Sequence, residues 1–458
     1  MKIALIGNMN NNNFAIMRYF RDLGIDAHLL LYANDGRDSG SHFTPEADTW
    51  DIKKWQPFIH RLSFANGMHS IVGRLEATVP YGIPIAIAKS IARRIGGNDI
   101  GWRPPRLSSL EKDLAGYDVF LGSGITPAVF QKIGRQLDLF YPYSIGIEFY
   151  GSPEFQLLLN SKNLFTRIAS KTVRDFQSKG IQNASVCINA EMGQTNDAFT
   201  ALGVKARPVS VPMVYVNSEN PTRPDEVDYL IDRIDIDDEN EIRFLHSARL
   251  VWVKREDYST SMWDIENKHN DWLFETFAML VASRPKTKVR LIVVEYGPDI
   301  EETKELIYEL GLDDYVVWVP MMPRKHLLWL CQHVSASVGE FYSTHGTLWG
   351  GTGWEALATG TPLIQGFNFE FGEFMCIFGY PPPPFLPVTK KLDILEHLIF
   401  IVDERAKLKS IGEQSQRWFQ EYNGEGLAKQ LLDLLKQCKG QEILNNAREG
   451  EKNEQCKN

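Results

Sequence analysis

The sequence lacks paired cysteines, long apolar runs and an excess of basic residues. Its 458 residues contain five cysteines, an odd number with no Cys-x-x-Cys spacing, at Cys187, Cys331, Cys376, Cys438 and Cys456. This pattern excludes a disulfide framework and a zinc site, and it is typical of reduced thiols in a cytoplasm. No run reaches the roughly 18 apolar residues that a membrane-spanning helix needs. The net charge of −9 argues against general nucleic-acid binding, which needs a basic surface.

The N-terminal residues do not resemble a signal peptide, because an apolar run of strand length, residues 2–7, is followed at once by asparagines. We therefore expect a cytoplasmic protein. Residues 83–94 leave a peripheral membrane contact open, since an apolar helical stripe stands there beside Lys89, Arg93 and Arg94. The alternative is a helix that packs on the core and has a solvated basic end.

Short apolar runs of strand type alternate with helical patterns along the chain, which predicts an α/β protein with mostly parallel sheets. The expected strands are 2–7, 26–31, 119–121, 139–143, 243–246, 288–294, 315–319, 334–338 and 362–365. The expected helices are 14–23, 127–137, 272–282, 301–310, 324–332, 392–404 and 413–436.

Length and composition predict two domains. We expect an N-terminal Rossmann-like domain over residues 1–210, a linker over 211–240, and a C-terminal Rossmann-like domain over 241–405. The linker contains Pro212, Pro221 and Pro224 and ends in a run of acids. Two such domains would face a cleft, because ligands of parallel α/β sheets bind beyond the carboxyl ends of the strands. A polar tail is expected over 441–458.

The most informative segment is a glycine-rich loop followed by a short helix. From residue 349 it reads Trp-Gly-Gly-Thr-Gly-Trp-Glu-Ala-Leu-Ala-Thr-Gly-Thr-Pro-Leu-Ile. Gly350, Gly351 and Gly353 would let backbone N–H groups converge on an anion at the helix N-terminus, which predicts a phosphate ligand. The alternative is a capping box formed by Thr352 and Glu355, which needs no ligand.

Residues 355–362 fit the pattern Glu, Ala, Met or Leu, Ala, any residue, Gly, any residue, Pro. This segment resembles the nucleotide-sugar loop of retaining glycosyltransferases with the GT-B fold, in particular family four. The resemblance implies two Rossmann-like domains facing a cleft, with helices of residues 406–440 packing back on the first domain. It implies a metal-independent, cofactor-free hexosyltransferase of carbohydrate biosynthesis. A nucleotide-sugar donor would pass its sugar, with retention, to a glycan, lipid-linked or small-molecule acceptor.

These enzymes place an arginine and a lysine after the first strand of the second domain, where both bind the donor diphosphate. Here that strand ends at His246, so Arg249 matches the arginine. Taken alone, Arg249 would be read as a surface ion pair. Lys254 has the family spacing of the lysine, whereas Lys268 directly precedes the next helix, and we favour Lys268.

The same resemblance assigns Glu355 to the ribose hydroxyls of the donor, since both carboxylate oxygens accept hydrogen bonds. A further glutamate that many members carry eight positions earlier is Thr347 here, and Glu340 is the nearest substitute. Glu340 and His345 would flank the transferred sugar, where either could bind its hydroxyls or stabilise charge at the anomeric centre. For His345 the alternative is a loop histidine in contact with water.

Further candidates lie in loops at strand ends. In the second domain, Gly297 in the turn 294–298 would lie near the donor, and backbone around Met321 would contact its base. In the first domain, two loops would meet the acceptor or the diphosphate, and their candidate residues are Gly7, Asn8, Asn10, Gly122 and Ser123. Ordinary turns are the alternative for these amide-rich loops.

Other function classes stay open. A nucleotide-sugar epimerase uses the same fold, and a non-catalytic protein that binds sugar nucleotides would explain the missing glutamate. A nicotinamide-dependent oxidoreductase is set aside, because Gly-x-Gly-x-x-Gly does not follow the first strand.

Overall fold

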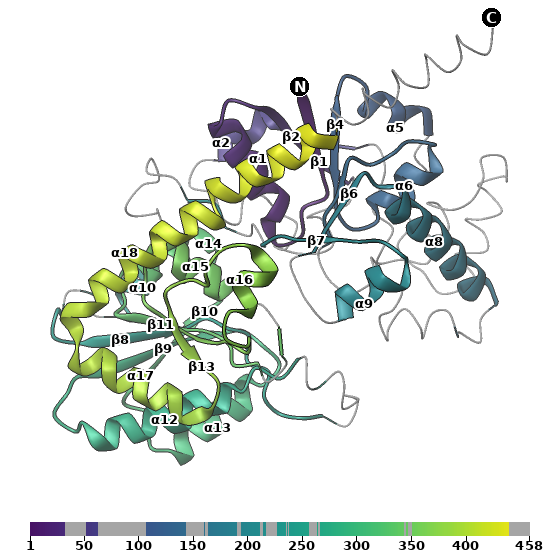
Figure 1. Cartoon of the computed structure of the whole chain (residues 1–458). Helices are drawn as coiled ribbons and strands as arrows, with labels where there is room; N and C mark the ends of the chain where they lie inside the picture. The colour runs from purple at the N-terminus through teal and green to yellow at the C-terminus, as the bar shows by residue number, and fades with distance from the viewer. Residues whose placement is uncertain are drawn as a thin grey trace, which may run out of the picture.

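The computed structural model describes residues 1–32, 52–62, 107–142, 160, 164–189, 194–210, 214–216, 227–234, 236, 238–255, 263, 266–342, 345–346 and 350–438. Two parallel α/β units make up this part of the chain (Figure 1). The predicted helix at 83–94, the polar tail 441–458 and Thr347 lie outside the described residues.

The first unit is a seven-stranded parallel sheet with the order β3-β2-β1-β4-β5-β6-β7. Its strands are β1 (Lys2–Ile6), β2 (Asp26–Leu31), β3 (Ile59–Arg61), β4 (Val119–Gly122), β5 (Leu139–Phe140), β6 (Val186–Asn189) and β7 (Arg207–Pro208). Its helices are η1 (Met9–Asn11), α1 (Asn12–Asp22), α2 (Ile52–Trp55), η4 (Gln56–Phe58), α5 (Leu107–Asp113), α6 (Thr126–Lys132), α8 (Leu164–Asn183) and α9 (Gln194–Ala201). The strand order reverses at β1, and Ile6 pairs with Gly122 there, so the loops after β1 and β4 start side by side.

The second unit is a six-stranded parallel sheet with the order β10-β9-β8-β11-β12-β13. Its strands are β8 (Ile242–His246), β9 (Val289–Glu295), β10 (Val316–Pro320), β11 (Ala336–Val338), β12 (Leu363–Gly366) and β13 (Leu386–Val388). Its helices are α12 (Asn270–Ser283), α13 (Ile300–Glu309), α14 (Arg324–Cys331), α15 (Gly351–Thr359), α16 (Glu373–Phe378) and α17 (Lys391–Asp403). The short helix α10 (Asp228–Ile231) precedes this sheet. In this sheet the strand order reverses at β8, which lies between β9 and β11.

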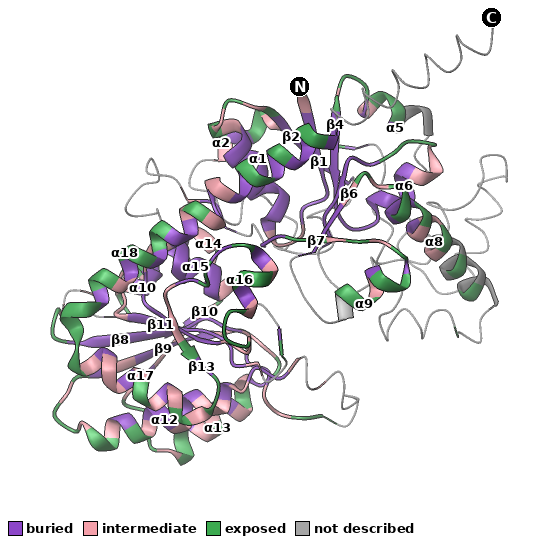
Figure 2. Ribbon diagram, in the orientation of Figure 1, coloured by how far each residue is buried: buried purple, intermediate pink, exposed green. Residues whose placement is uncertain are grey.

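The prediction of an α/β chain with two Rossmann-like domains is confirmed, and every predicted strand falls on a strand of the structure. The central strands of both sheets are buried, whereas the edge strands β3, β7 and β13 carry exposed residues (Figure 2). The predicted strand 139–143 is shorter, and the predicted helix 127–137 ends at Lys132. β13 was not expected, because Pro387 interrupts a strand pattern; the proline is tolerated since β13 lies at the sheet edge.

The prediction of a single helix over 413–436 is wrong. The structure has α18 (Arg405–Tyr422) and a separate helix over 425–438, with a break at Asn423 and Gly424. Asn423 donates through Nδ2 to Ser210 Oγ at 2.8 Å, and this buried bond ties the break to the end of the first unit. A polar contact with the other domain therefore fixes the bend.

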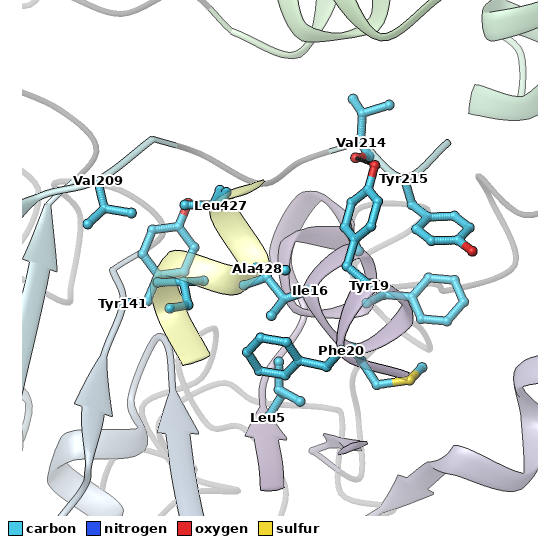
Figure 3. Packing of buried hydrophobic residues seen from close by; sticks show 14 of the residues in the cluster. Leu5, Ile16, Tyr19, Phe20, Tyr141, Val209, Val214, Tyr215, Leu427 and Ala428 are labelled. Carbon is cyan, nitrogen blue, oxygen red and sulfur yellow. Dashed lines mark hydrogen bonds between the residues drawn. The ribbon is translucent and has the colours of Figure 1, made fainter. Parts of the chain in front are cut away.

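The helix over 425–438 packs against the first unit. Leu427 and Ala428 belong to the same buried cluster as Ile16 of α1 and Tyr141, and Figure 3 shows them together. α18 itself packs against α15 of the second unit, so the two consecutive helices contact both domains. Within the described residues, no helix is both long and apolar enough to cross a bilayer.

A close backbone contact seats α18 on α15. A Cβ atom added at Gly412 would stand 2.0 Å from the carbonyl oxygen of Gly360. We expect Gly412→Ala to lower the free energy of unfolding by about 1–3 kcal/mol, because the helices must separate to make room. Lys409→Ala, on the exposed side of the same helix, should change it by less than about 0.5 kcal/mol. Chemical denaturation measures both, and equal stability of the two variants would contradict this packing.

Candidate functional site

Three hydrogen-bond donors meet on the carboxylate of Glu340, which follows β11. Lys268 Nζ donates to Oε1 and to the hydroxyl of Tyr342, that hydroxyl donates to Oε2 at 2.9 Å, and the Gly350 N–H donates to Oε2 at 3.0 Å. Glu340 and Lys268 are both buried. Because Gly350 stands at the start of α15, this junction connects β11, the segment before α12 and the glycine-rich helix.

The electrostatics of the junction keep Glu340 ionised. Burial alone would raise the pKa of its carboxyl, but the Lys268 ammonium, the Gly350 N–H and the Tyr342 hydroxyl together hold that pKa below its usual range. The result is a buried anion that holds a cation beside the N-terminus of a helix.

The alternative interpretation of Thr352 and Glu355 as a capping box is wrong. α15 begins at Gly351 with Gly350 as its N-cap, and no side chain of the described residues caps it. Glu355 Oε1 instead accepts a hydrogen bond from Arg324 Nε. The N–H groups of residues 351–353 belong to the first turn, where they have no intrahelical partners and point out of the helix end. The geometry that favours an anion is therefore present beside Lys268.

The loop after β8 carries Arg249 and runs next to Lys268. The Lys268 N–H donates to the carbonyl of Val251 at 2.8 Å. Arg249 Nη2 donates to Glu266 Oε2 at 2.5 Å, and both side chains are partly exposed. Arg249 thus lies on a segment adjacent to Lys268 and is held by a surface ion pair, as the alternative interpretation expected. Lys254, the other lysine candidate, is exposed.

A buried histidine fixes this loop. The His246 ring donates through Nδ1 to the carbonyl of Val338 at 2.9 Å and accepts at Nε2 from the Asn270 amide at 2.9 Å. Asn270 Oδ1 accepts the Val251 N–H at 2.9 Å. A carbonyl can only accept and an amide nitrogen can only donate, so these partners require the neutral ring. Burial lowers the pKa of His246 to about 4, which agrees.

Gly297 supports the same loop from the other side. Its φ of +133° and its closeness to Leu250 exclude a side chain, since a Cβ atom would stand 2.4 Å from the Leu250 carbonyl oxygen. Asp299, which sequence reasoning missed, accepts the N–H groups of Trp252 and Val253 at 2.7 and 2.9 Å. Gly297 therefore shapes the Arg249 loop by permitting close backbone contact.

Two candidates lie apart from these contacts. Met321 follows β10, and its side chain is largely exposed. His345 is exposed and bonds through Nε2 to Glu373 Oε1 of α16 at 3.0 Å, as an ordinary loop histidine can. The structure does not join either of them to the Lys268 junction.

Arg324, the partner of Glu355, connects the second domain with the first. Arg324 Nε donates to Glu355 Oε1 at 2.7 Å, and Arg324 Nη1 donates to the carbonyl of Asn10 at 3.2 Å. Sequence reasoning missed Arg324, because it lies 31 positions from Glu355 and 314 from Asn10. The asparagine loop is thereby placed beside α14 and α15.

Most candidates of the first domain serve the turns themselves. Asn8 is buried and bonds to Asn11 and to the N–H of Phe14. Asn13, another residue missed, donates to the carbonyl of Gly7 at 2.8 Å and to Ser123 Oγ at 3.1 Å. Gly122 ends β4, and a Cβ atom there would stand 2.5 Å from a Thr126 methyl. These contacts hold the loops after β1 and β4 together.

The described residues contain no cluster of three or more His, Cys, Asp or Glu side chains that could hold a metal ion. The donors that the structure does bring together are the Lys268 ammonium and the first-turn amides of α15, and the Arg249 loop runs alongside them.

The fold is that of GT-B glycosyltransferases. Anabaena Alr3699/HepE, solved in complex with UDP, is 14% identical with a TM-score of 0.56, and the match covers 95% of this chain and 100% of that one. A lipopolysaccharide outer core galactosyltransferase, WaaB, is 15% identical with a TM-score of 0.50, covering 95% and 99%. The UDP-GlcNAc 2-epimerase of Neisseria meningitidis is 11% identical with a TM-score of 0.50, covering 95% and 100%.

At sequence identities of 11–15%, these similarities show that the chain shares a fold with these proteins and show nothing further. No protein-family model matches the sequence, and no curated protein sequence matches it.

The neutral state of His246 has a consequence for stability. Its pKa is about 4 in the folded protein and 6.5 in its ordinary state, so only the unfolded chain binds a proton between these values. This contribution to stability is fully present above pH 6.5 and is lost as the pH falls to 4, by about 3 kcal/mol. In His246→Gln, we expect the free energy of unfolding to fall less steeply over this range in chemical denaturation. Equal slopes would show that His246 titrates normally.

The buried ion pair of Lys268 and Glu340 should contribute more to the free energy of unfolding than the exposed Lys254 side chain does. Lys268→Met leaves the Glu340 carboxylate buried without its cation, so we expect a loss of about 3–5 kcal/mol in the free energy of unfolding. Lys254→Met, at an exposed position, serves as the matched control and should be within about 0.5 kcal/mol of the parent. Similar free energies of unfolding for the two variants would show that Lys268 does not form a buried ion pair with Glu340.

Proposed function

We propose that this chain is a glycosyltransferase that transfers a sugar from a nucleotide-sugar donor to a glycan, lipid-linked or small-molecule acceptor. The observation that carries the proposal is the position of the Lys268 ammonium beside the N-terminus of α15, at the carboxyl ends of β8 and β11. A cation and convergent backbone N–H groups suit a diphosphate. The GT-B fold and the UDP bound in the HepE structure support this ligand class.

The proposed chemistry places fixed positive charge where the leaving group develops negative charge. As the bond between the anomeric carbon and the diphosphate oxygen breaks, its electron pair stays on the diphosphate. The acceptor hydroxyl oxygen forms the new bond to the anomeric carbon, and the hydroxyl proton passes to the diphosphate. The amides of residues 351–353, Lys268 and Arg249 would hold that charge, with Arg249 turning from Glu266 to the phosphate. Lys268 and the amides are already oriented by the fold and need no reorganisation during the reaction, whereas Arg249 would turn to the phosphate when the donor binds.

Glu355 would accept hydrogen bonds from the ribose hydroxyls through the oxygen that Arg324 does not occupy. Glu340 acts in this proposal by holding Lys268 and the Gly350 amide, and it would contact the sugar from that position. We propose that the reaction is metal-independent, because cationic side chains and amides supply the charge, and that it retains the anomeric configuration, as the resemblance implies. A cytoplasmic location and a peripheral membrane contact stay predictions.

The decisive assay incubates the protein with a panel of nucleotide sugars and follows the release of nucleoside diphosphate. Slow release, faster with acceptor, is expected for a transferase. Interconversion of sugars without release would identify an epimerase. Binding without either change would identify a non-catalytic sugar-nucleotide protein.

Arg249→Ala should lower kcat about 10²- to 10³-fold, because a cationic donor to the leaving diphosphate is lost. Glu355→Gln should also abolish donor turnover, since the amide offers one acceptor oxygen in place of two. Arg405→Ala is a matched control, because that exposed arginine bonds to the carbonyl of Glu239, within the second half of the chain. Normal turnover in Arg249→Ala and Glu355→Gln, with all variants folded by circular dichroism, would refute the site assignment.

A further inference from the structure

Arg324 contacts both domains through one guanidinium group. It is the first residue of α14 and follows Pro323, and its side chain is largely buried. Nε donates to Glu355 Oε1 at 2.7 Å within the second domain, and Nη1 donates to the carbonyl of Asn10 at 3.2 Å in the first. Glu355 is 5% exposed. The two contacts are therefore made in a largely buried place, where a charge needs partners.

Both sides of this contact are energetically unfavourable when taken alone. A cation at the first residue of a helix opposes the helix dipole, which favours negative charge there. On the other side, Asn10 and Asn11 have φ angles of +51° and +61°, a left-handed conformation that residues other than glycine rarely adopt. Such features persist where the surrounding structure requires them. Here they meet at one hydrogen bond between the domains.

The chemistry of the contact also explains the residue type. A guanidinium group presents several N–H donors in a fixed plane, so it can serve a carboxylate and a carbonyl at once. A lysine carries a single charged nitrogen and could pair with Glu355 without reproducing both directions. Arg324 therefore donates at the same time to the Glu355 carboxylate of α15 and to the backbone of the asparagine loop.

We propose that Arg324 is a positioning residue that couples the two domains to the donor site. It fixes the orientation of the Glu355 carboxylate and at the same time holds the loop of Asn10 against the second domain. The donor would then be bound in the domain arrangement in which the loops after β1 and β4 face it. The proposal rests on the proposed function, because Glu355 is assigned to the donor ribose there.

The test compares Arg324→Lys with Arg324→Gln in the full chain, using steady-state kinetics and hydrogen–deuterium exchange. Arg324→Lys keeps a cation beside Glu355 and loses the simultaneous donation to the carbonyl of Asn10. We expect its donor KM to stay within about twofold while kcat falls on the order of tenfold, a size typical of coupling between sites. In Arg324→Lys, the rate of amide hydrogen–deuterium exchange should rise in the segment 8–14 and stay unchanged in α12. Arg324→Gln should in addition raise the donor KM about tenfold, because Glu355 loses its cation.

Arg284→Lys and Arg284→Gln are the matched controls, because Arg284 pairs with Asp403 inside the second domain. Both should behave as the parent protein. Unchanged kcat in Arg324→Lys, or unchanged exchange in the segment 8–14, would overturn the proposal. If the parent protein turns over no nucleotide sugar, the proposed function fails instead, while the exchange experiment still reports whether Arg324 holds the two domains together.

Discussion

The carboxylate of Glu340 is the point on which the candidate site depends. It is buried, it stays ionised, and it accepts hydrogen bonds from Lys268, Tyr342 and the Gly350 N–H. A buried carboxylate needs such partners, because removing a charge from water without compensation is costly. One residue thereby sets both the place of the ammonium group and the start of α15, so the two features that favour an anion occur together.

The fold explains why these residues can meet. In each parallel sheet the order of strands reverses at a central strand, β1 in the first and β8 in the second, and the loops that follow neighbouring strands open to opposite sides. β8 and β11 bring the Arg249 loop, Lys268 and Glu340 to one edge. The contact of Arg324 with Asn10 then places the corresponding loop of the first domain beside that edge. A donor bound at this edge would therefore lie between loops of both domains.

Local patterns in the sequence predicted the alternation of strands and helices, since the predicted strands are apolar runs that are largely buried in the structure. β3 and β7 were not predicted, because Ile-His-Arg and Arg-Pro are not apolar runs. Local patterns also predicted that Lys268 and Glu340 lie at strand or helix ends. They did not predict Arg324 or Asn13 as partners, because those contacts join residues 314 and 110 positions apart. Tyr342 is two positions from Glu340 but 74 from Lys268, and the contact with Lys268 is set by the fold. The capping box is absent because α15 begins at Gly351, so Thr352 lies inside the first turn and is not the N-cap. The Glu355 carboxylate bonds to Arg324.

The central claim is that the N-terminus of α15 and Lys268 form a site for the diphosphate of an activated sugar. Crystals of the protein with UDP, GDP or ADP test it most directly. The account predicts a β-phosphate within hydrogen-bond distance, about 2.7–3.2 Å, of the amides of residues 351–353 and of Lys268 Nζ. A diphosphate bound elsewhere, with Lys268 and these amides in contact only with protein, would contradict it.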